Sequence, residues 1–384
     1  MIVEQLSLAD FRNYTSADIA LTAGTNLFVG RNGQGKTNLA EAIAYLATLG
    51  SHRVSADAPL VRAGADAAFV RARLAHGGRR VTLELQISKQ GSNKARIGGS
   101  PVRTAELPRY AQVVLFAPED LQIVRGDPSA RRRFVDQLLV QRSPRMAAVL
   151  ADYDRVLKQR GALLKSARAR GIRGDALSTL DVWDDKLVAL GAQIIDARAA
   201  LTAVLTPPAI TAYAQIAGAD HRPELEWANS IRGFDPDEDA ATAAAATAGS
   251  TEELFRAALG ARRSAELDRG LTLVGPHRDD LLLRIRGLPV RGYASHGESW
   301  SVALALRLAS AEMLRADSPI GDPVVILDDV FAELDADRRA RLGDLVAGYE
   351  QVIVTAAVEA DVPDALRGRT VRIEAGVIRS VEDD

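Results

Sequence analysis

Residues Gly30 to Thr37 have the types and spacing of a loop that binds a phosphate chain. They spell Gly-Arg-Asn-Gly-Gln-Gly-Lys-Thr, which fits the pattern G-x-x-x-x-G-K-[ST]. In this pattern backbone N–H groups face the phosphates, Lys36 reaches the β- and γ-phosphates, and the Thr37 hydroxyl binds magnesium. The alternative is a glycine-rich turn with an incidental lysine. The candidate nucleotide-binding residues are Gly30, Arg31, Asn32, Gly33, Gln34, Gly35, Lys36 and Thr37.

Two adjacent carboxylates, Asp328 and Asp329, follow the apolar run Val324 to Leu327. An apolar run that ends in an acid fits a buried strand leading to a metal site. Asp328 is then expected to hold magnesium, and Asp329 to orient or deprotonate the attacking water. We therefore take Lys36, Asp328 and Asp329 as the catalytic candidates, and Thr37 and Asp328 as the magnesium ligands. The alternative is a solvated turn at a strand end.

A third short motif, Ser295-His296-Gly297-Glu298, stands before an apolar-rich segment at 299–314. Its place upstream of the acidic strand is the order found in ATP-binding cassette proteins. In those proteins the serine and the helix N-terminus bind the γ-phosphate held by the opposite subunit. The alternative is a plain helix cap, in which Ser295 or Ser299 accepts hydrogen bonds from helix N–H groups.

These motifs need strands and helices to position them. The pattern predicts strands at 2–8, 19–21 and 26–29, then a helix at about 36–49 behind the phosphate loop. Residues 68–74 and 81–87 alternate around His76-Gly77-Gly78, which predicts a hairpin. The continuous apolar runs at 324–327 and 352–354 are typical of strands buried on both faces. We expect the strands from both ends of the chain to form one sheet.

The middle of the chain is different. Helical patterns at about 143–170 and 177–205 are separated by a break at 171–175. Leu180, Trp183, Leu187, Leu190, Ile194, Ala197 and Leu201 repeat in steps of three and four, as in a heptad. Val149, Tyr153, Val156 and Leu163, interrupted by Arg160, would face them. This predicts an antiparallel helical hairpin, with two helices of an ordinary bundle as the alternative. A low-complexity loop follows at 234–251, and a helix at 252–269.

The amino-acid composition limits the kinds of site and partner that this protein can have. The chain has 384 residues, 47% of them apolar, no cysteine and a net charge of −2. The lack of cysteine excludes disulfides and thiolate metal sites, and the small net charge means that DNA contact requires a local basic patch. No apolar run approaches the ~20 residues that cross a bilayer, and the N-terminus lacks the features of a signal peptide. We expect a cytoplasmic protein without membrane contact.

Several stretches together resemble the RecF family, bacterial recombinational-repair ATPases of the SMC-like branch. They are residues 8–14, 30–38, 51–53, 116–121, 131–136, 275–280 and 327–335. Gly275-Pro276-His277-Arg278-Asp279-Asp280 is the most family-specific. The resemblance implies an α/β fold: an ABC-type P-loop ATPase head, with a mixed sheet and a β-rich N-terminal part, and a helical insertion that forms a second lobe. The expected domains are 1–140 and 271–384 for the head, and 141–270 for the insertion.

The resemblance also implies a mechanism. ATP and Mg²⁺ would be buried in a homodimer, between the Lys36 loop of one subunit and Ser295, Gly297 and Glu298 of the other. Glu333 and Asp335 would form the D-loop, and Arg12 would lie beside the adenine. Closure would clamp DNA at single-strand gaps and duplex junctions, and weak DNA-stimulated hydrolysis would release it. The family acts with RecO and RecR and helps RecA to load.

Three departures from the wider cassette pattern matter. Asp329 stands where most cassette proteins have glutamate, so slow turnover is expected. Thr355 and Ala356 stand where the usual switch histidine would follow the last strand. Gln112 and Gln122 are both unconvincing as the Q-loop glutamine.

The DNA-contacting residues are predicted from charge alone. The candidates are Arg71, Arg73, Arg131 and Arg132, with Arg79, Arg80 and Arg133 as further members of the set. Alternation puts Arg71 and Arg73 on one strand face, where a phosphate-binding patch would be salt-sensitive. The alternative is an arginine surface that is solvated or paired within the molecule; Arg132 and Arg133, for example, could pair with Asp136 on one helix.

Three functional hypotheses remain. The first is an ATPase clamp of the RecF type, in DNA repair, recombination and replication. The second is a P-loop nucleotide kinase or phosphotransferase, although a kinase has no use for the Ser295 motif. The third is an SMC-like head of another role, such as a clamp that binds ATP with negligible turnover.

Overall fold

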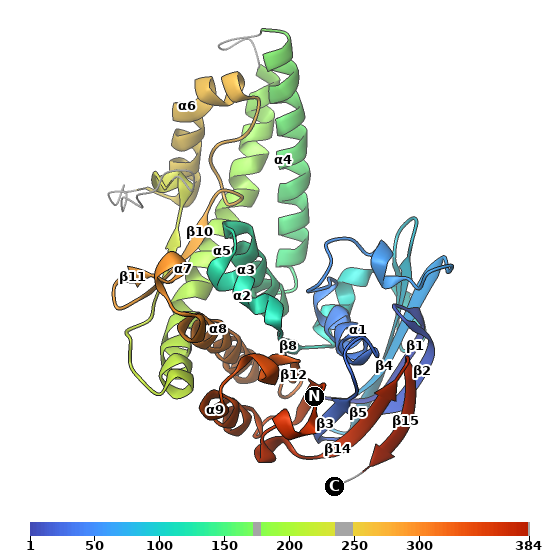
Figure 1. Ribbon diagram of the computed structural model, residues 1–384. Helices are drawn as coiled ribbons and strands as arrows, with labels where there is room; N and C mark the ends of the chain where they lie inside the picture. The colour runs from blue at the N-terminus through green and yellow to red at the C-terminus, as the bar shows by residue number, and fades with distance from the viewer. Residues whose placement is uncertain (172–177, 235–248, 383–384) are drawn as a thin grey trace. The chain divides into compact units, whose positions relative to one another are not determined.

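The computed structural model describes residues 1–171, 178–234 and 249–382 (Figure 1). The break predicted at 171–175 and the loop predicted at 234–251 lie largely outside the described residues. The chain divides into two compact units. The first comprises Met1–Val124, Pro207–Pro223 and Tyr293–Asp384, and the second comprises Arg125–Thr206 and Glu224–Gly292.

Within the described residues, the first unit contains two six-stranded sheets. The N-terminal sheet is antiparallel, in the order β2-β1-β4-β5-β6-β7. The core sheet has the order β15-β14-β3-β13-β12-β8 and is parallel except for β15 at its edge. Their bounds are β1 Ile2–Phe11, β2 Tyr14–Ala20, β3 Gly24–Val29, β4 Ala67–His76, β5 Arg79–Ser88, β6 Lys94–Ile97, β7 Ser100–Val102, β8 Val113–Phe116, β12 Val324–Asp328, β13 Gln351–Ala356, β14 Arg369–Glu374 and β15 Val377–Glu382.

The prediction of one sheet from both ends of the chain is right for the core sheet and wrong for the rest. β3 and β8 pair with strands from the C-terminal part. The other N-terminal strands form a sheet of their own, because their alternating pattern leaves one face in solvent. Along β4, Val70 and Ala72 are buried while Arg71 and Arg73 are exposed. The predicted β4–β5 hairpin is confirmed.

Helix α1 (Lys36–Thr48) joins the two sheets into one core. Its buried face, including Leu39, Ile43 and Leu46, belongs to the same apolar cluster as the inner residues of both sheets. Helices α8 (His296–Asp317) and α9 (Ala336–Val346) and the last turns of α5 (Ser178–Ala217), from Pro207 to Ala217, also belong to this unit. The buried Asp328 thus ends a strand that is covered on both faces, as the apolar run predicted.

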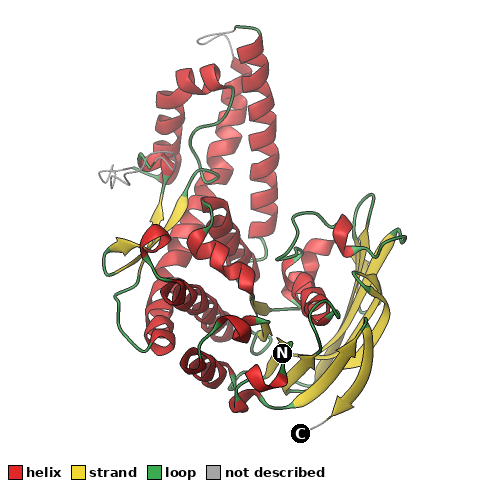
Figure 2. Ribbon diagram, viewed as in Figure 1, coloured by secondary structure: helices red, strands yellow, loops and turns green. Residues whose placement is uncertain are grey.

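The second unit is mainly helical, and its helices are red in Figure 2. Three short strands form the sheet β11-β10-β9, which the sequence did not predict. The bounds are α3 Pro128–Arg142, α4 Met146–Ala169, α5 Ser178–Ala217, β9 Glu224–Ala228, α6 Thr251–Arg269, β10 Asp280–Ile285 and β11 Leu288–Pro289, with the short helices α2 Leu121–Arg125 and α7 Val290–Tyr293 near the boundaries of the two units.

Helices α4 and α5 are antiparallel, as predicted, but α6 packs beside α4 and the group resembles a small bundle (Figure 1). Arg160 does not interrupt the packing. Its fully buried guanidinium donates to Asp184 on α5 at 2.6 Å and to Glu266 on α6 at 2.5 Å. Leu164 is buried where we predicted Leu163, because Arg160 occupies the centre of the face.

Helix α5 does not end near Leu205 as predicted. It continues through Pro207 and Pro208 to Ala217. The buried side chains of Tyr213 and Ile216 anchor this continuation by packing. By length and apolar composition this helix could cross a membrane. However, half of its most apolar window is buried, and it carries the ion-paired Asp184 and Arg198.

The stretch Gly275 to Asp280 belongs to the second unit, not to the head as we expected. The buried pair between Arg131 and Asp280, 2.7 Å apart, fastens α3 to β10. Asp279 accepts from the N–H and the hydroxyl of Ser230, each at 2.8 Å. The boundaries between the two compact units lie at 124/125 and 292/293, where we expected 140/141 and 270/271. Residues 207–223, which we expected in the insertion, belong to the first unit.

Two titratable groups in this stretch respond to acid in opposite directions. Burial lowers the pKa of His277 to about 4, below its ordinary value near ~6.5. Burial raises the pKa of Asp279 to about 6, above its ordinary value near ~3.9. As the pH falls from about 6.5 to 4, His277 takes up its proton first in the unfolded chain, so its protonation favours unfolding. Asp279 favours the folded chain over nearly the same range.

This opposition predicts the acid sensitivity of two variants. Asp279→Asn should lose stability more steeply than wild type between pH 7 and 4.5, and His277→Gln less steeply, each by roughly 2 kcal/mol over the range. Chemical unfolding at several pH values measures the slopes. The reverse order of the two variants would contradict the directions of these two pKa shifts.

Candidate nucleotide-binding site

The phosphate loop lies where the sequence placed it, between β3 and α1. Lys36 is the first residue of α1. Gly33 and Gly35 have φ angles of 80° and 114°, a region that side chains other than glycine rarely adopt. Arg31, Asn32 and Gly33 are exposed, whereas Lys36 is 3% exposed. The loop therefore presents its backbone to solvent at the N-terminal end of a helix, which favours an anion.

Two loop glycines also allow close packing. A Cβ on Gly30 would lie 2.3 Å from the Ile373 carbonyl oxygen of β14. A Cβ on Gly35 would lie 2.7 Å from the hydroxyl of Tyr14, which donates to the Gly35 carbonyl at 3.1 Å. Both glycines are therefore needed by the protein itself, beyond any approach of a phosphate.

The Lys36 ammonium lies inside the loop. Nζ donates to the carbonyls of Gly30 at 2.7 Å and Arg31 at 3.3 Å. Gln34 anchors the loop to the β14–β15 turn: its backbone carbonyl accepts from Gly376 N at 3.0 Å, and its side chain accepts from Ala375 N. The ammonium is thus held where it can bind phosphate oxygens.

Asp328 and Asp329 are not in a solvated turn. Asp328 is 2% exposed and its Oδ1 accepts from the Thr355 hydroxyl at 2.7 Å. The same hydroxyl oxygen accepts from Asp329 N at 3.0 Å. Burial raises the pKa of Asp329, and the Asp328 and Glu119 carboxylates add to this, while the Lys36 ammonium opposes it. Lys36, Asp328, Asp329 and Glu119 thus belong to one electrostatic cluster.

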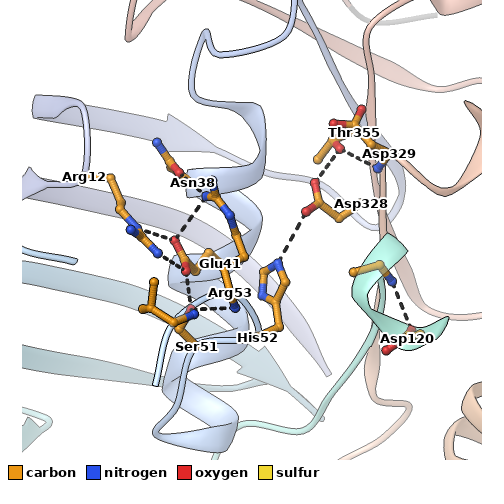
Figure 3. Close-up of polar contacts among 12 residues, drawn as sticks. Arg12, Asn38, Glu41, Ser51, His52, Arg53, Asp120, Asp328, Asp329 and Thr355 are labelled. Atoms are coloured by element: carbon orange, nitrogen blue, oxygen red, sulfur yellow. Dashed lines mark hydrogen bonds and ion pairs between the residues drawn. The ribbon is translucent and has the colours of Figure 1, made fainter. Parts of the chain in front are cut away.

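A buried carboxylate that the sequence did not single out organises the other side of the site. Glu41 is fully buried on α1 and binds Arg12 through two hydrogen bonds, at 2.6 and 2.8 Å. It also accepts from the Ser51 hydroxyl at 2.5 Å, and Arg53 lies 3.8 Å away. Arg53 donates to Asn38 on the first turn of α1 (Figure 3). An acid between Ala40 and Ala42 in an apolar helix was the available signal.

His52 is a second residue at the site that the sequence motifs did not indicate. Figure 3 shows its ring pointing toward the Asp328 carboxylate. Nε2 lies 3.6 Å from Asp328 Oδ2. In the sequence it belongs to the stretch 51–53 that resembles the family.

The Ser295 segment has the geometry of a helix cap and the exposure of a contact surface. Ser295 Oγ accepts from Glu298 N at 3.2 Å, and Glu298 Oε2 accepts from Ser295 N at 2.8 Å, which is a capping box. Ser295 is exposed at the N-terminus of the 22-residue helix α8. The cap and the proposed contact with a nucleotide are compatible.

The predicted D-loop lies beside this segment. Asp335 caps α9 by accepting from Arg338 N at 2.9 Å, and Arg338 also donates to Ser301 on α8 at 3.1 Å. Glu333 lies 4.0 Å from His296. Glu333, Asp335 and Ser295 are all exposed, so the starts of two helices form one surface.

The structure divides the predicted DNA-binding arginines. Arg71 and Arg73 are exposed on the outer face of the N-terminal sheet, near Glu84 at 3.5 Å and Glu4 at 3.0 Å. Arg131 is 5% exposed and paired with Asp280, which corrects its assignment as a DNA contact. Arg132 donates to the Asp279 carbonyl, and Asp136 pairs with Arg198 rather than with Arg132 or Arg133. Arg131 and Arg132 therefore contribute to the packing of the second unit.

Gln112 is buried and Gln122 is exposed. Between them, Asp120 is buried, accepting from Ala117 N at 3.0 Å and from Arg307 at 2.6 Å. Thus Asp120 holds the turn that carries Glu119.

The residues present fit magnesium that is held mainly by a nucleotide. No group of three or more acidic or histidine side chains among the described residues could bind a metal alone. Magnesium bound with substrate phosphates needs only one or two protein ligands. The Thr37 hydroxyl and the Asp328 carboxylate supply that donor set.

Comparisons with known proteins agree on one family. The family model described as "RecF/RecN/SMC N terminal domain" matches residues 2–377. The DNA replication and repair protein RecF of Clavibacter sepedonicus is 60% identical over 386 residues, covering 98% of this chain and 95% of that protein. RecF of Leifsonia xyli subsp. xyli is 57% identical, covering 98% and 99%.

Solved structures give the same result. A structure of the recombination mediator protein RecF with ATP, in the RecFOR pathway, matches with a TM-score of 0.85 and 27% identity, covering 98% of this chain and 96% of that one. An Smc head domain from Pyrococcus furiosus matches at a TM-score of 0.54 and 15% identity, which supports the head fold alone.

The close packing at Gly30 makes a testable prediction. Gly30→Ala should weaken ATP binding and destabilise the protein by about 1–3 kcal/mol, because the new methyl group meets the β14 backbone. Gly50→Ala is the matched control, since its nearest neighbour lies 3.9 Å away and its φ is ordinary. Calorimetric titration with ATP and thermal unfolding measure both effects. Equal behaviour of the two variants would contradict the steric argument.

Proposed function

Because the chain belongs to the RecF family of SMC-like ATP-binding proteins, we propose that it is an ATP-dependent DNA-binding protein of DNA replication and recombinational repair. It works in the cytoplasm, binds ATP with Mg²⁺ through the Gly30–Thr37 loop, and hydrolyses it slowly in response to DNA. Two copies close on shared nucleotide and clamp DNA at gaps and junctions, and hydrolysis releases the DNA. With RecO and RecR, it assists RecA loading.

The observation that carries the proposal is the exposed surface formed by the starts of α8 and α9. Ser295 presents the N-terminus of a long helix, whose partial positive charge favours a phosphate. Arg338 ties this helix to Asp335, so the two segments stay side by side. A second subunit that presents its phosphate loop to this surface would complete the site. A nucleotide kinase has no use for such a surface.

The chemistry of hydrolysis rests on the acidic pair. Bound magnesium would neutralise charge on the β- and γ-phosphates, with Thr37 and Asp328 as its protein ligands. Lys36 binds phosphate oxygens from inside the loop. Asp329 orients the attacking water, and its raised pKa makes it a better proton acceptor near neutral pH. Its shorter side chain favours a slow switch over rapid turnover.

Measurements of ATP-driven dimerisation test whether two subunits share the nucleotide site. The chain offers a closely matched control for the Ser295 variant. Ser250 caps α6 with the same capping box as Ser295. Replacing either serine by alanine should cost about 1 kcal/mol of stability. Only Ser295→Ala should weaken ATP-driven dimerisation in sedimentation velocity runs. ADP, or the Lys36→Arg variant with ATP, should leave the protein monomeric. A wild-type protein that stays monomeric with ATP would overturn the shared site.

Measurements of DNA binding at graded salt test whether the outer face of the N-terminal sheet contacts DNA. The ion pairs of Arg71 and Arg73 are exposed, so each contributes little and can be exchanged for a phosphate. Replacing both by glutamine should reduce the slope of log affinity against log salt by about 2 for duplex-containing substrates. The same change at Arg103 and Arg109, which both pair with Glu106 on the surface, should leave the slope unchanged. An unaltered slope in the first variant would place DNA elsewhere.

A further inference from the structure

His52 combines two unusual properties. Both ring nitrogens are buried and neither has a hydrogen-bond partner in the described part of the chain. At the same time Nε2 lies 3.6 Å from Asp328 Oδ2, just beyond hydrogen-bond distance. Leaving buried polar atoms without partners costs free energy, so such a group in a folded protein calls for a reason.

The loop that carries His52 is held tightly. Leu49, with φ of 52°, ends α1 and turns the chain back along the helix. Ser51 Oγ then accepts from the N–H groups of Arg53 and Val54, at 2.9 and 3.1 Å, while donating to the buried Glu41. The residues on both sides of His52 are therefore fixed, and its direction is set by the loop.

The opposite side of the same carboxylate is also fixed. Asp328 Oδ1 accepts from the Thr355 hydroxyl at 2.7 Å, and this strand-end contact leaves Oδ2 facing the imidazole. A carboxylate held through one oxygen alone can still rotate about its side-chain bonds. A donor at Oδ2 would remove that freedom.

We propose that His52 is a positioning residue for magnesium: when Mg²⁺ binds with the nucleotide, Nε2–H closes the gap to Asp328 Oδ2 and donates a hydrogen bond to it, which fixes the direction in which this carboxylate faces the metal. The proposal rests on the proposed function, because it requires Mg²⁺ with ATP at this site. Groups that orient a metal ligand without touching the metal commonly change metal affinity about 10–100-fold when they are removed. At the end of β13, Thr355 and Ala356 stand where cassette proteins have their switch histidine. His52 brings an imidazole to this site from a different loop.

The test compares two side chains of similar size. His52→Leu fills the space without an N–H group, and His52→Gln can place an N–H near the Nε2 position. Binding of a nonhydrolysable ATP analogue is measured by calorimetry at graded Mg²⁺, and the full-length protein with Mn²⁺ and the analogue is examined by electron paramagnetic resonance. His76→Ala, on β4 of the same unit, is the control.

The expected result is a roughly tenfold higher Mg²⁺ requirement for His52→Leu, with an altered Mn²⁺ spectrum. His52→Gln should stay close to wild type, and binding in the presence of a chelator should be equal in all variants. An unchanged Mg²⁺ requirement in His52→Leu, or equal loss in the Leu and Gln variants, would overturn the proposal. If His52→Leu does not fold, His52→Asn, too short to reach Oδ2, takes its place.

The readout separates this inference from the proposed function. Nucleotide binding and its Mg²⁺ requirement are properties of one subunit and can be measured at protein concentrations where no dimer forms. A failure of ATP-driven dimerisation would therefore leave the His52 test intact. Conversely, a normal dimer with an unchanged Mg²⁺ requirement in His52→Leu would remove only the role of His52.

Discussion

The site depends on the register of three parallel strands. In the core sheet, Val29 of β3 pairs with Ala356 of β13, and Thr355 of β13 pairs with Asp328 of β12. The phosphate loop therefore starts at the level where the acidic pair begins, although about 300 residues separate them in the chain. A slip of one residue would turn Asp328 to the opposite face of the sheet. The interleaving of N- and C-terminal strands is thus the constraint that makes one site from two distant motifs.

Local motifs were predictable because their geometry is local. The Gly30–Thr37 spacing contains the turn, the lysine and the helix start, and the structure places them as expected. The run Val324 to Leu327 identified a strand buried on both faces in the same way. The partners of Glu41 and His52 were not predictable, because they are brought together by a loop that folds back along α1 after a left-handed Leu49. The periodicity of apolar residues in one sequence does not show that the chain turns back along α1 at this point.

Charge patterns gave the least reliable predictions. Three consecutive arginines at 131–133 suggested a surface for DNA, yet Arg131 is buried against Asp280 and Arg132 binds the Asp279 carbonyl. Arg160 interrupts the apolar pattern of its helix, yet its buried guanidinium binds Asp184 and Glu266 at the centre of that face. In each case the partner is more than 20 residues away in the chain, so the sequence shows the charged residue but not the residue that it pairs with. Arg71 and Arg73 were placed correctly on one face because strand alternation is again a local property.

The stretch Gly275 to Asp280, which carried much of the resemblance to the family, illustrates how a distinctive motif can serve architecture. A Cβ on Gly275 would lie 2.7 Å from both Phe255 and the Tyr153 hydroxyl. Asp279 binds Ser230, and Asp280 binds Arg131. These contacts join α3, α4, α6 and β10 within the second unit. Specificity of a motif to a family therefore does not by itself locate chemistry. The chemical assignment rests on the first unit, where the register of β3, β13 and β12 brings the phosphate loop level with the acidic pair. There burial raises the pKa of Asp329, and the Lys36 ammonium opposes this rise.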